Sequence, residues 1–165
     1  MSTFPATFAE DVINASAQAQ FEAFLDEHRG QLNRSLDGLT EEQARRSLVP
    51  SATTLLGLVK HATFLEKVWF DEAVTGRSRA EIGIPEASGE SFIVHDDDTI
   101  ASIQQGHRDA CAASRLATST LGPNEWVYGY RRGPVPLHWV YLHVLRELAQ
   151  HCGHADILRE QILAG

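Results

Sequence analysis

The chain has 165 residues, of which 43% are hydrophobic and 22% are charged, as is usual for a globular domain with a buried core. The formal net charge of −8 argues against a nucleic-acid binder and against electrostatic docking on an anionic membrane. The chain has only two cysteines, which predicts reduced thiols rather than a disulfide framework. It has no basic leader and no apolar run long enough to span a bilayer. We therefore expect one cytoplasmic domain over residues 1–165 without a membrane segment.

Two long amphipathic patterns occupy the first half of the chain. In residues 19–38, apolar side chains recur at helical spacing and Gly38 follows as a stop signal. Thr40 and Gln43 then have the spacing of a capping box, which predicts a short helical turn. A second long helix is expected over residues 53–74, capped by Ser51 or Thr53. Its apolar stripe includes His61, whereas Lys60, Glu66 and Lys67 are expected to face solvent.

The second half contains two more such patterns, separated by irregular segments. Residues 76–96 have Gly, Pro and Ser punctuation and predict a long loop. The acidic run 96–98 opens a third helix that extends to about Leu121. Residues 122–136 predict an ordered loop or a short extended excursion. Pro136 then begins a fourth helix that runs to about Leu163. Four helices and few strand signals predict an all-α bundle, in which His28, His95 and His107 have structural roles.

The fourth helix carries an unusual polar stripe on the face that should enter the core. His143, Glu147, His151 and His154 are spaced by four, four and three residues, so they share one face. Val140, Val144 and Leu158 lie on the same face. Burying ionisable groups is costly unless something pairs with them, so this stripe needs a partner.

The stripe is consistent with a metal site. Glu147 and His151 lie one turn apart and can reach one ion, and His61, on the other strongly apolar helix, supplies a third ligand. Zn²⁺ is the metal we expect, although Fe²⁺, Ni²⁺ and Mn²⁺ also suit two histidines and a carboxylate. His143 and His154 either join the ligands, orient them or transfer protons. A buried hydrogen-bond network without a metal is the alternative, and spacing alone does not choose between the two.

Two segments resemble a known family. "SATTLLGLVKHATFLEKVWF" and "PLHWVYLHVLRELAQHCGHADILRE" contain the motifs S-x-x-x-L-x-G-L-x-x-H, from Ser51 to His61, and E-x-x-x-H-x-G-H-A-D, from Glu147 to Asp156. The pair is similar to motifs of the DinB-like superfamily, in its actinobacterial mini-circle branch. Many relatives have histidine in place of Glu147. The Glu-x-x-x-His pattern here resembles the metal domain of mycothiol-dependent maleylpyruvate isomerase.

The resemblance implies an up-down-down-up four-helix bundle with a metal held by His61, Glu147 and His151. It also implies use of a low-molecular-weight thiol of the mycothiol type as cosubstrate. The expected activity is transfer of that thiol to an electrophilic small molecule, with His154 or His143 as the catalytic group that takes the thiol proton. The chain lacks the extra C-terminal domain of the isomerase, so transfer is expected rather than isomerisation.

Other functions and an assembly are also consistent with the resemblance. A non-catalytic metal or small-molecule binder with a stress-related role is one alternative, and a metal-dependent hydrolase is another. The family also implies a homodimer formed through helix faces. Its candidate apolar contacts here are Trp69, Phe70, Trp126 and Tyr128.

Overall fold

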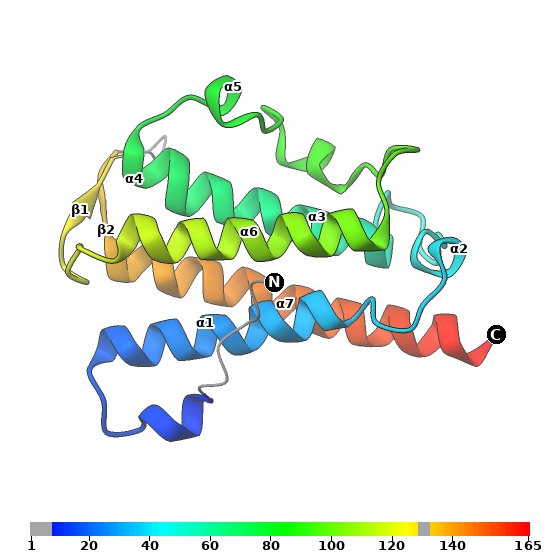
Figure 1. The fold of residues 1–165 in the computed structure, drawn as a ribbon, viewed down its shortest axis with the longest axis horizontal. Helices are drawn as coiled ribbons and strands as arrows, with labels where there is room; N and C mark the ends of the chain where they lie inside the picture. The colour runs from blue at the N-terminus through cyan, green and yellow to red at the C-terminus, as the bar shows by residue number, and fades with distance from the viewer. Residues whose placement is uncertain (1–7, 129–132) are drawn as a thin grey trace.

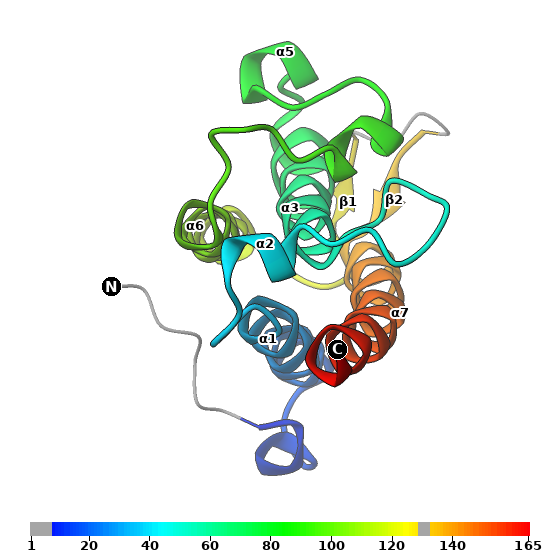
Figure 2. The same ribbon diagram turned by 90° about the vertical axis from the view of Figure 1, so that its right-hand side faces the viewer.

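Four helices form the body of the computed structural model, which describes residues 8–128 and 133–165 (Figure 1). They are α1 (Ala17–Arg34), α3 (Leu55–Glu66), α6 (Ile100–Thr118) and α7 (Leu137–Ala164). In Figure 1, α1 and α7 run in one direction, and α3 and α6 run in the other. Viewed from one end, the four helices surround a common core (Figure 2). The predicted all-α bundle with up-down-down-up order is therefore confirmed.

The second predicted helix forms over almost its whole expected length, but not as a regular α-helix. After α3 it continues as a π-helix, η2 (Lys67–Glu72), and then as α4 (Ala73–Thr75). It ends at Gly76, whose φ of 74° is a conformation that glycine adopts without strain. Its N-cap is Thr54, not Ser51 or Thr53, because the Thr54 side chain accepts the hydrogen bond from the backbone N–H of Gly57.

The predicted loop after this helix crosses the bundle and contains two short helical segments. They are α5 (Arg79–Ile82), capped by Ser78, and the 3₁₀ segment η3 (Ser88–Phe92). In Figure 1 this crossover passes over α3 and allows α6 to run parallel to it. Thr99 caps α6 with a capping box, and the helix ends at Thr118, three residues before the predicted end.

The remaining segments are short. The predicted turn at Thr40 forms as α2 (Glu41–Ala44) with the expected capping box, and a 3₁₀ turn, η1 (Ala9–Val12), precedes α1. The extended excursion expected over 122–136 contains an antiparallel pair, β1 (Trp126–Val127) and β2 (Val135–Pro136). Its residues 129–132 lie outside the described part of the chain. Pro136 is the N-cap of α7 rather than its first residue.

Aliphatic side chains dominate the core, and each buried leucine contributes about 1.5–3 kcal/mol of transfer free energy. Buried examples from the four helices are Leu25, Leu32, Leu58, Leu148 and Ile103. Trp69 and Phe70 belong to this core, with 6% and 1% of their surface exposed, so they are not free for a dimer contact. Trp126 and Tyr128 are exposed. In the described residues, no helix is long and apolar enough to cross a membrane.

A buried cluster of ion pairs that the sequence did not predict also lies inside this core. Glu66 was expected in solvent but has no exposed surface, because both of its carboxylate oxygens accept hydrogen bonds from the Arg29 guanidinium, at 2.8 and 2.7 Å. Arg29 also pairs with Asp26, which in turn pairs with Arg115 of α6. A bidentate pair of this kind satisfies the buried charges and links α1 to α3.

Candidate functional site

His61 lies in the interior of α3 with 5% of its surface exposed, and its ring is held from two sides. Nδ1 is 2.7 Å from Oγ of Ser91. The ring stacks on Phe92, with the centroids 3.9 Å apart and the planes inclined by 15°. Because the Ser91 hydroxyl donates its proton to the carbonyl of Ser88 at 2.5 Å, it accepts from His61. Nδ1 therefore carries the ring proton and Nε2 carries a free lone pair, which is the arrangement that a metal ligand needs.

Gly57 explains why the crossover lies so close to His61. A Cβ at this position would lie 2.6 Å from the carbonyl oxygen of Phe92, so only glycine allows η3 to lie directly on α3. This glycine is the G of the S-x-x-x-L-x-G-L-x-x-H motif, one turn before His61. Its close contact brings Ser91 and Phe92 onto the His61 ring.

His151 of α7 faces His61 across the bundle. Their ring centroids are 4.9 Å apart and the rings are nearly perpendicular. His151 is 9% exposed, and neither of its ring nitrogens has a hydrogen-bond partner among the described residues. Burial, followed by the neighbouring His151, lowers the pKa of His61 to about 4, and burial likewise lowers the pKa of His151. Both rings are therefore neutral near pH 7 and able to act as ligands.

Glu147 lies one turn before His151, with its two oxygens directed to different neighbours. Oε2 is 3.9 Å from Nε2 of His151, and Oε1 is 3.9 Å from Nε2 of His143. Oε1 also accepts a hydrogen bond from Arg146 at 2.9 Å. The carboxylate is a quarter exposed and lies at the border between the buried histidines and solvent.

His143 is held by aromatic rings at the outer end of the stripe. It stacks on Trp139, with centroids 5.0 Å apart, and packs against Trp69 at 4.4 Å. Trp69 belongs to the π-helix, a distortion that is often found at functional sites. Arg146 donates to Nδ1 of His143, and burial lowers the pKa of this histidine.

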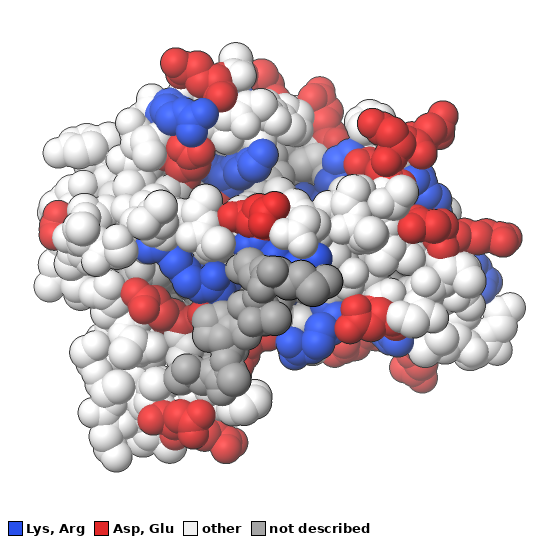
Figure 3. All heavy atoms as spheres, in the orientation of Figure 1, with Lys and Arg blue, Asp and Glu red and all other residues white. Residues whose placement is uncertain are grey.

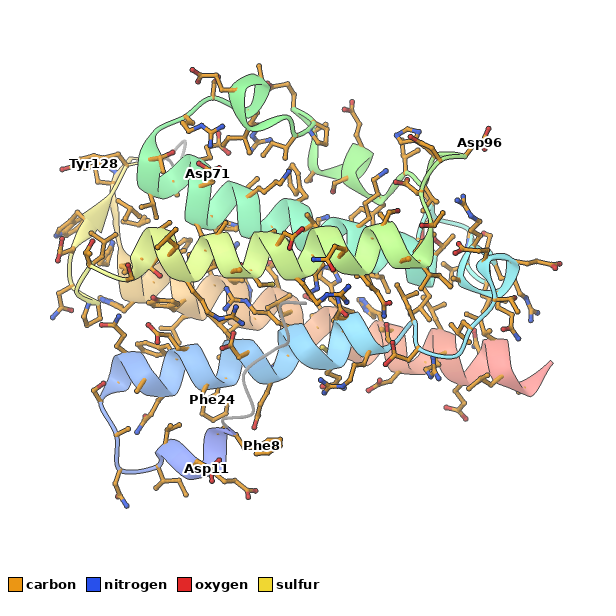
Figure 4. The ribbon with its side chains drawn as sticks, in the orientation of Figure 1. Phe8, Asp11, Phe24, Asp71, Asp96 and Tyr128 are labelled. Carbon is orange, nitrogen blue, oxygen red and sulfur yellow. The ribbon has the colours of Figure 1, made fainter. Side chains whose placement is uncertain are left out.

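These side chains line one large cavity of about 970 Å³ between α3, η2, the crossover and α7. His61, His143, Glu147 and His151 all contribute to its wall. The other polar residues of the lining come from η2, α5, the crossover and the hairpin: Glu72, Arg79, Glu86, Ser88 and Tyr128. Tyr128 points away from the bundle at the end where β1 lies (Figure 4). The cavity is thus a polar chamber within the size range of small-molecule sites.

His154 is not part of this chamber. Its side chain is exposed, and it lines a smaller surface cavity with Ser51, Thr53 and Ile157. Its ring centroid is 6.0 Å from that of His151. The structure therefore brings four of the five predicted site residues to one chamber and places His154 outside it.

The predicted metal ligands, His61, Glu147 and His151, lie near one another but do not converge on one point. As the side chains stand, no three His, Cys, Asp or Glu groups in the described chain are close enough together to hold one ion. The two histidines nevertheless fit a metal, because one has its tautomer fixed by Ser91 and the other has two buried nitrogens without partners. A buried hydrogen-bond network, the alternative to a metal, would have satisfied those nitrogens.

The sequence predicted the histidines but missed the residues that hold them. Ser91 and Phe92 lie thirty residues from His61 in a segment without periodicity, and Gly57 inside a helix was the only signal of their approach. Cys152 lies beside His151 but does not face the chamber as a lining residue. Its thiol is buried and directed to the His28 carbonyl, and burial raises its pKa to about 11.

Comparison with known proteins identifies the family of the chain. A family model described as mycothiol S-transferase matches residues 20–164, which include all four bundle helices except the first turn of α1. No curated protein matches the chain. Because the matched region includes both motifs and nearly all of the bundle, the chain belongs to the mycothiol S-transferase family.

Proposed function

We propose that the protein transfers a mycothiol-type low-molecular-weight thiol to an electrophilic small molecule, at a divalent metal held by His61, Glu147 and His151. The observation that carries the proposal is His151. A buried imidazole with two unpaired nitrogens, 4.9 Å from a second imidazole whose Nδ1 is already engaged, is unstable without a further partner. The family match favours a thiol as the reactant.

The ligand roles follow from the chemistry of each side chain. His61 offers Nε2, because Ser91 fixes its proton on Nδ1. Glu147 adds a carboxylate once it turns from Arg146, which holds it at the surface. Zn²⁺ is the ion that best suits a site of two imidazoles and a carboxylate with open positions. A bound divalent metal acts as a Lewis acid that lowers the pKa of a thiol from about 8.5.

His143 is the group that we assign to the thiol proton. It lines the chamber, whereas His154 does not. Its pKa is lowered and its hydrogen bond to Arg146 lies at the surface, where the Arg146 side chain is 67% exposed. Release of this bond frees one ring nitrogen to accept the proton. The sulfur then forms a C–S bond with the electrophilic carbon, and the leaving group departs with the electrons of its former bond.

The chamber provides the remaining requirements. The polar wall formed by Glu72, Arg79 and Glu86 suits a hydrophilic thiol, and the aromatic wall formed by Trp69 and Phe92 suits an apolar electrophile. Holding both reactants beside the histidines reduces the entropic cost of their reaction.

The first experiment measures metal content in untagged protein beside His61→Ala, His151→Ala and the matched control His154→Ala. We expect about one equivalent of metal in the wild type and the control, and none in the other two variants. If metal content does not differ between His151→Ala and His154→Ala, the proposed ligand set is wrong.

The second experiment measures consumption of mycothiol with 1-chloro-2,4-dinitrobenzene as electrophile. Turnover that requires both thiol and metal supports the proposal, with a loss of about 10²-fold or more in His143→Gln and little change in His154→Gln. Metal binding without turnover on a panel of electrophiles identifies a binding protein instead. Ester or amide cleavage without added thiol identifies a hydrolase.

A further inference from the structure

Two further cavities lie on another face of α3, away from the histidines of the metal chamber. The first, of about 430 Å³, lies between α3, the crossover and the start of α6. The second, of about 500 Å³, lies between η2 and the second half of α6. Lys67 and Gly106 line both of them, so the two cavities meet there. We call this pair the α3–α6 groove. In Figure 3 the corresponding face is hollowed between α6 and the crossover, with Lys and Arg side chains inside the hollow.

Gly106 keeps this groove open at its centre. It lies in the middle of α6, where glycine costs about 1 kcal/mol relative to alanine. A Cβ at this position would meet nothing within 4 Å, so no close packing requires the glycine. Its effect is to leave free space at the point where the two cavities meet. The glycine thus leaves open space on the floor of the groove, where the apolar part of a ligand can lie.

The walls of the groove are largely apolar. Phe64, Ile84 and Ile103 line the first cavity, and Phe70 and Leu116 line the second. Leu116 has 77% of its surface exposed, the largest fraction among the large hydrophobic residues of the described chain. Exposed apolar side chains bordering a groove are a common sign of a ligand site.

Lys67 provides one cation at the junction. No carboxylate in the described residues is within ion-pair distance of it, whereas Lys60 is held by Asp98 at 2.6 Å. Three acids share the second cavity with Lys67, and all have other partners: Glu66 is paired with Arg29, as described above. Asp71, labelled in Figure 4, pairs with Arg77 at 2.9 Å, and Asp109 accepts a hydrogen bond from Gln105. Glu90, an exposed residue of η3, is the acid at the rim of the first cavity.

We infer that the α3–α6 groove binds an amphipathic carboxylate, a molecule with an apolar body and one anionic group. The apolar body lies along the groove over Gly106, and the carboxylate pairs with Lys67. The site is separate from the metal chamber, but Phe64 lines both, and Ser91, the hydrogen-bond partner of His61, lines the groove. A ligand in the groove therefore contacts the opposite side of the residue that holds His61.

Octanoate is a suitable probe, and isothermal titration calorimetry of the whole protein measures its binding. We expect saturable binding of one octanoate per chain, and clearly weaker binding of 1-octanol, which has the same apolar body without the charge. Gly106→Leu fills the groove without a backbone clash and should weaken octanoate binding at least ten-fold. Lys67→Gln should weaken it by about five-fold, the effect of one solvent-accessible ion pair.

Two control variants test specificity. Gly153→Leu makes the same change at another helical glycine whose Cβ would meet nothing within 4 Å, and Arg34→Gln removes a positive charge from α1. Both should bind octanoate as the wild type does. The inference is overturned if octanoate does not bind, if 1-octanol binds equally well, or if Gly106→Leu binds like Gly153→Leu. Because none of these measurements requires a metal or a thiol, their failure is distinct from failure of the proposed transfer activity.

Discussion

Ser91→Ala removes the acceptor that fixes the His61 tautomer. The Ser91 side chain is 4% exposed, and its Oγ lies 2.7 Å from Nδ1 of His61, so water does not replace it easily. A buried donor left without a partner costs about 1–3 kcal/mol. Since about 1.4 kcal/mol corresponds to a factor of ten, we expect the variant to bind metal roughly 5- to 150-fold more weakly. Loss of a residue that orients a ligand histidine typically has an effect of about 10–100-fold, in the same range.

Competition with a chromophoric zinc chelator measures this affinity directly. Ser114→Ala is a matched control, because Ser114 is also 4% exposed and donates one hydrogen bond to a backbone carbonyl. It should lose a similar amount of stability but retain its metal affinity. If Ser91→Ala binds Zn²⁺ as tightly as Ser114→Ala does, the argument that Ser91 fixes the His61 tautomer for metal binding is refuted.

Three further predictions concern the fold. Glu66→Ala removes the bidentate partner of the buried Arg29 guanidinium, which keeps only Asp26, and should lower the free energy of unfolding by about 3–5 kcal/mol, measured by urea denaturation. A loss below about 1 kcal/mol would contradict this. Burial lowers the pKa of His107 to about 4, so its stabilisation is present above pH 6.5 and is lost as the pH falls towards 4. Unfolding followed at several pH values should show a contribution of about 3 kcal/mol from His107 to this loss. His107→Gln should remove that contribution and leave the one from His61, whose pKa is also lowered to about 4. Gly57→Ala should lower both the melting temperature and the metal affinity because its Cβ meets a backbone carbonyl at 2.6 Å, whereas Gly153→Ala should lower neither.

The positions of the helices followed from local signals that act within a few residues. Apolar periodicity placed all four helices, and the capping box at Thr40 placed the short α2. The errors were of one or two residues at N-caps and of about three at the ends of α1 and α6. At the start of α3, the hydroxyl groups of Ser51, Thr53 and Thr54 could each cap the helix, and the tertiary geometry chooses Thr54.

Glu66 shows why local pattern fails for charged residues. A charge beside an apolar stripe is normally solvated, and nothing near Glu66 in the sequence indicated Arg29, which is 37 residues away. The pair became buried only because α1 packs against α3 with both groups facing inward. The π-helix after Glu66 could not be predicted either, because no residue type in this segment distinguishes a π-helix from an α-helix.

For the site, the sequence by itself determined which side chains share a helical face, because a spacing of three or four residues fixes that face. It therefore placed Glu147, His151 and His143 together. It also placed His154 with them, since it contained no information on where the chamber ends. Only the tertiary structure decided that His61 faces His151 and that Ser91 holds His61. Contacts between residues distant in the chain depend on how whole helices and loops pack, and no local spacing encodes that packing.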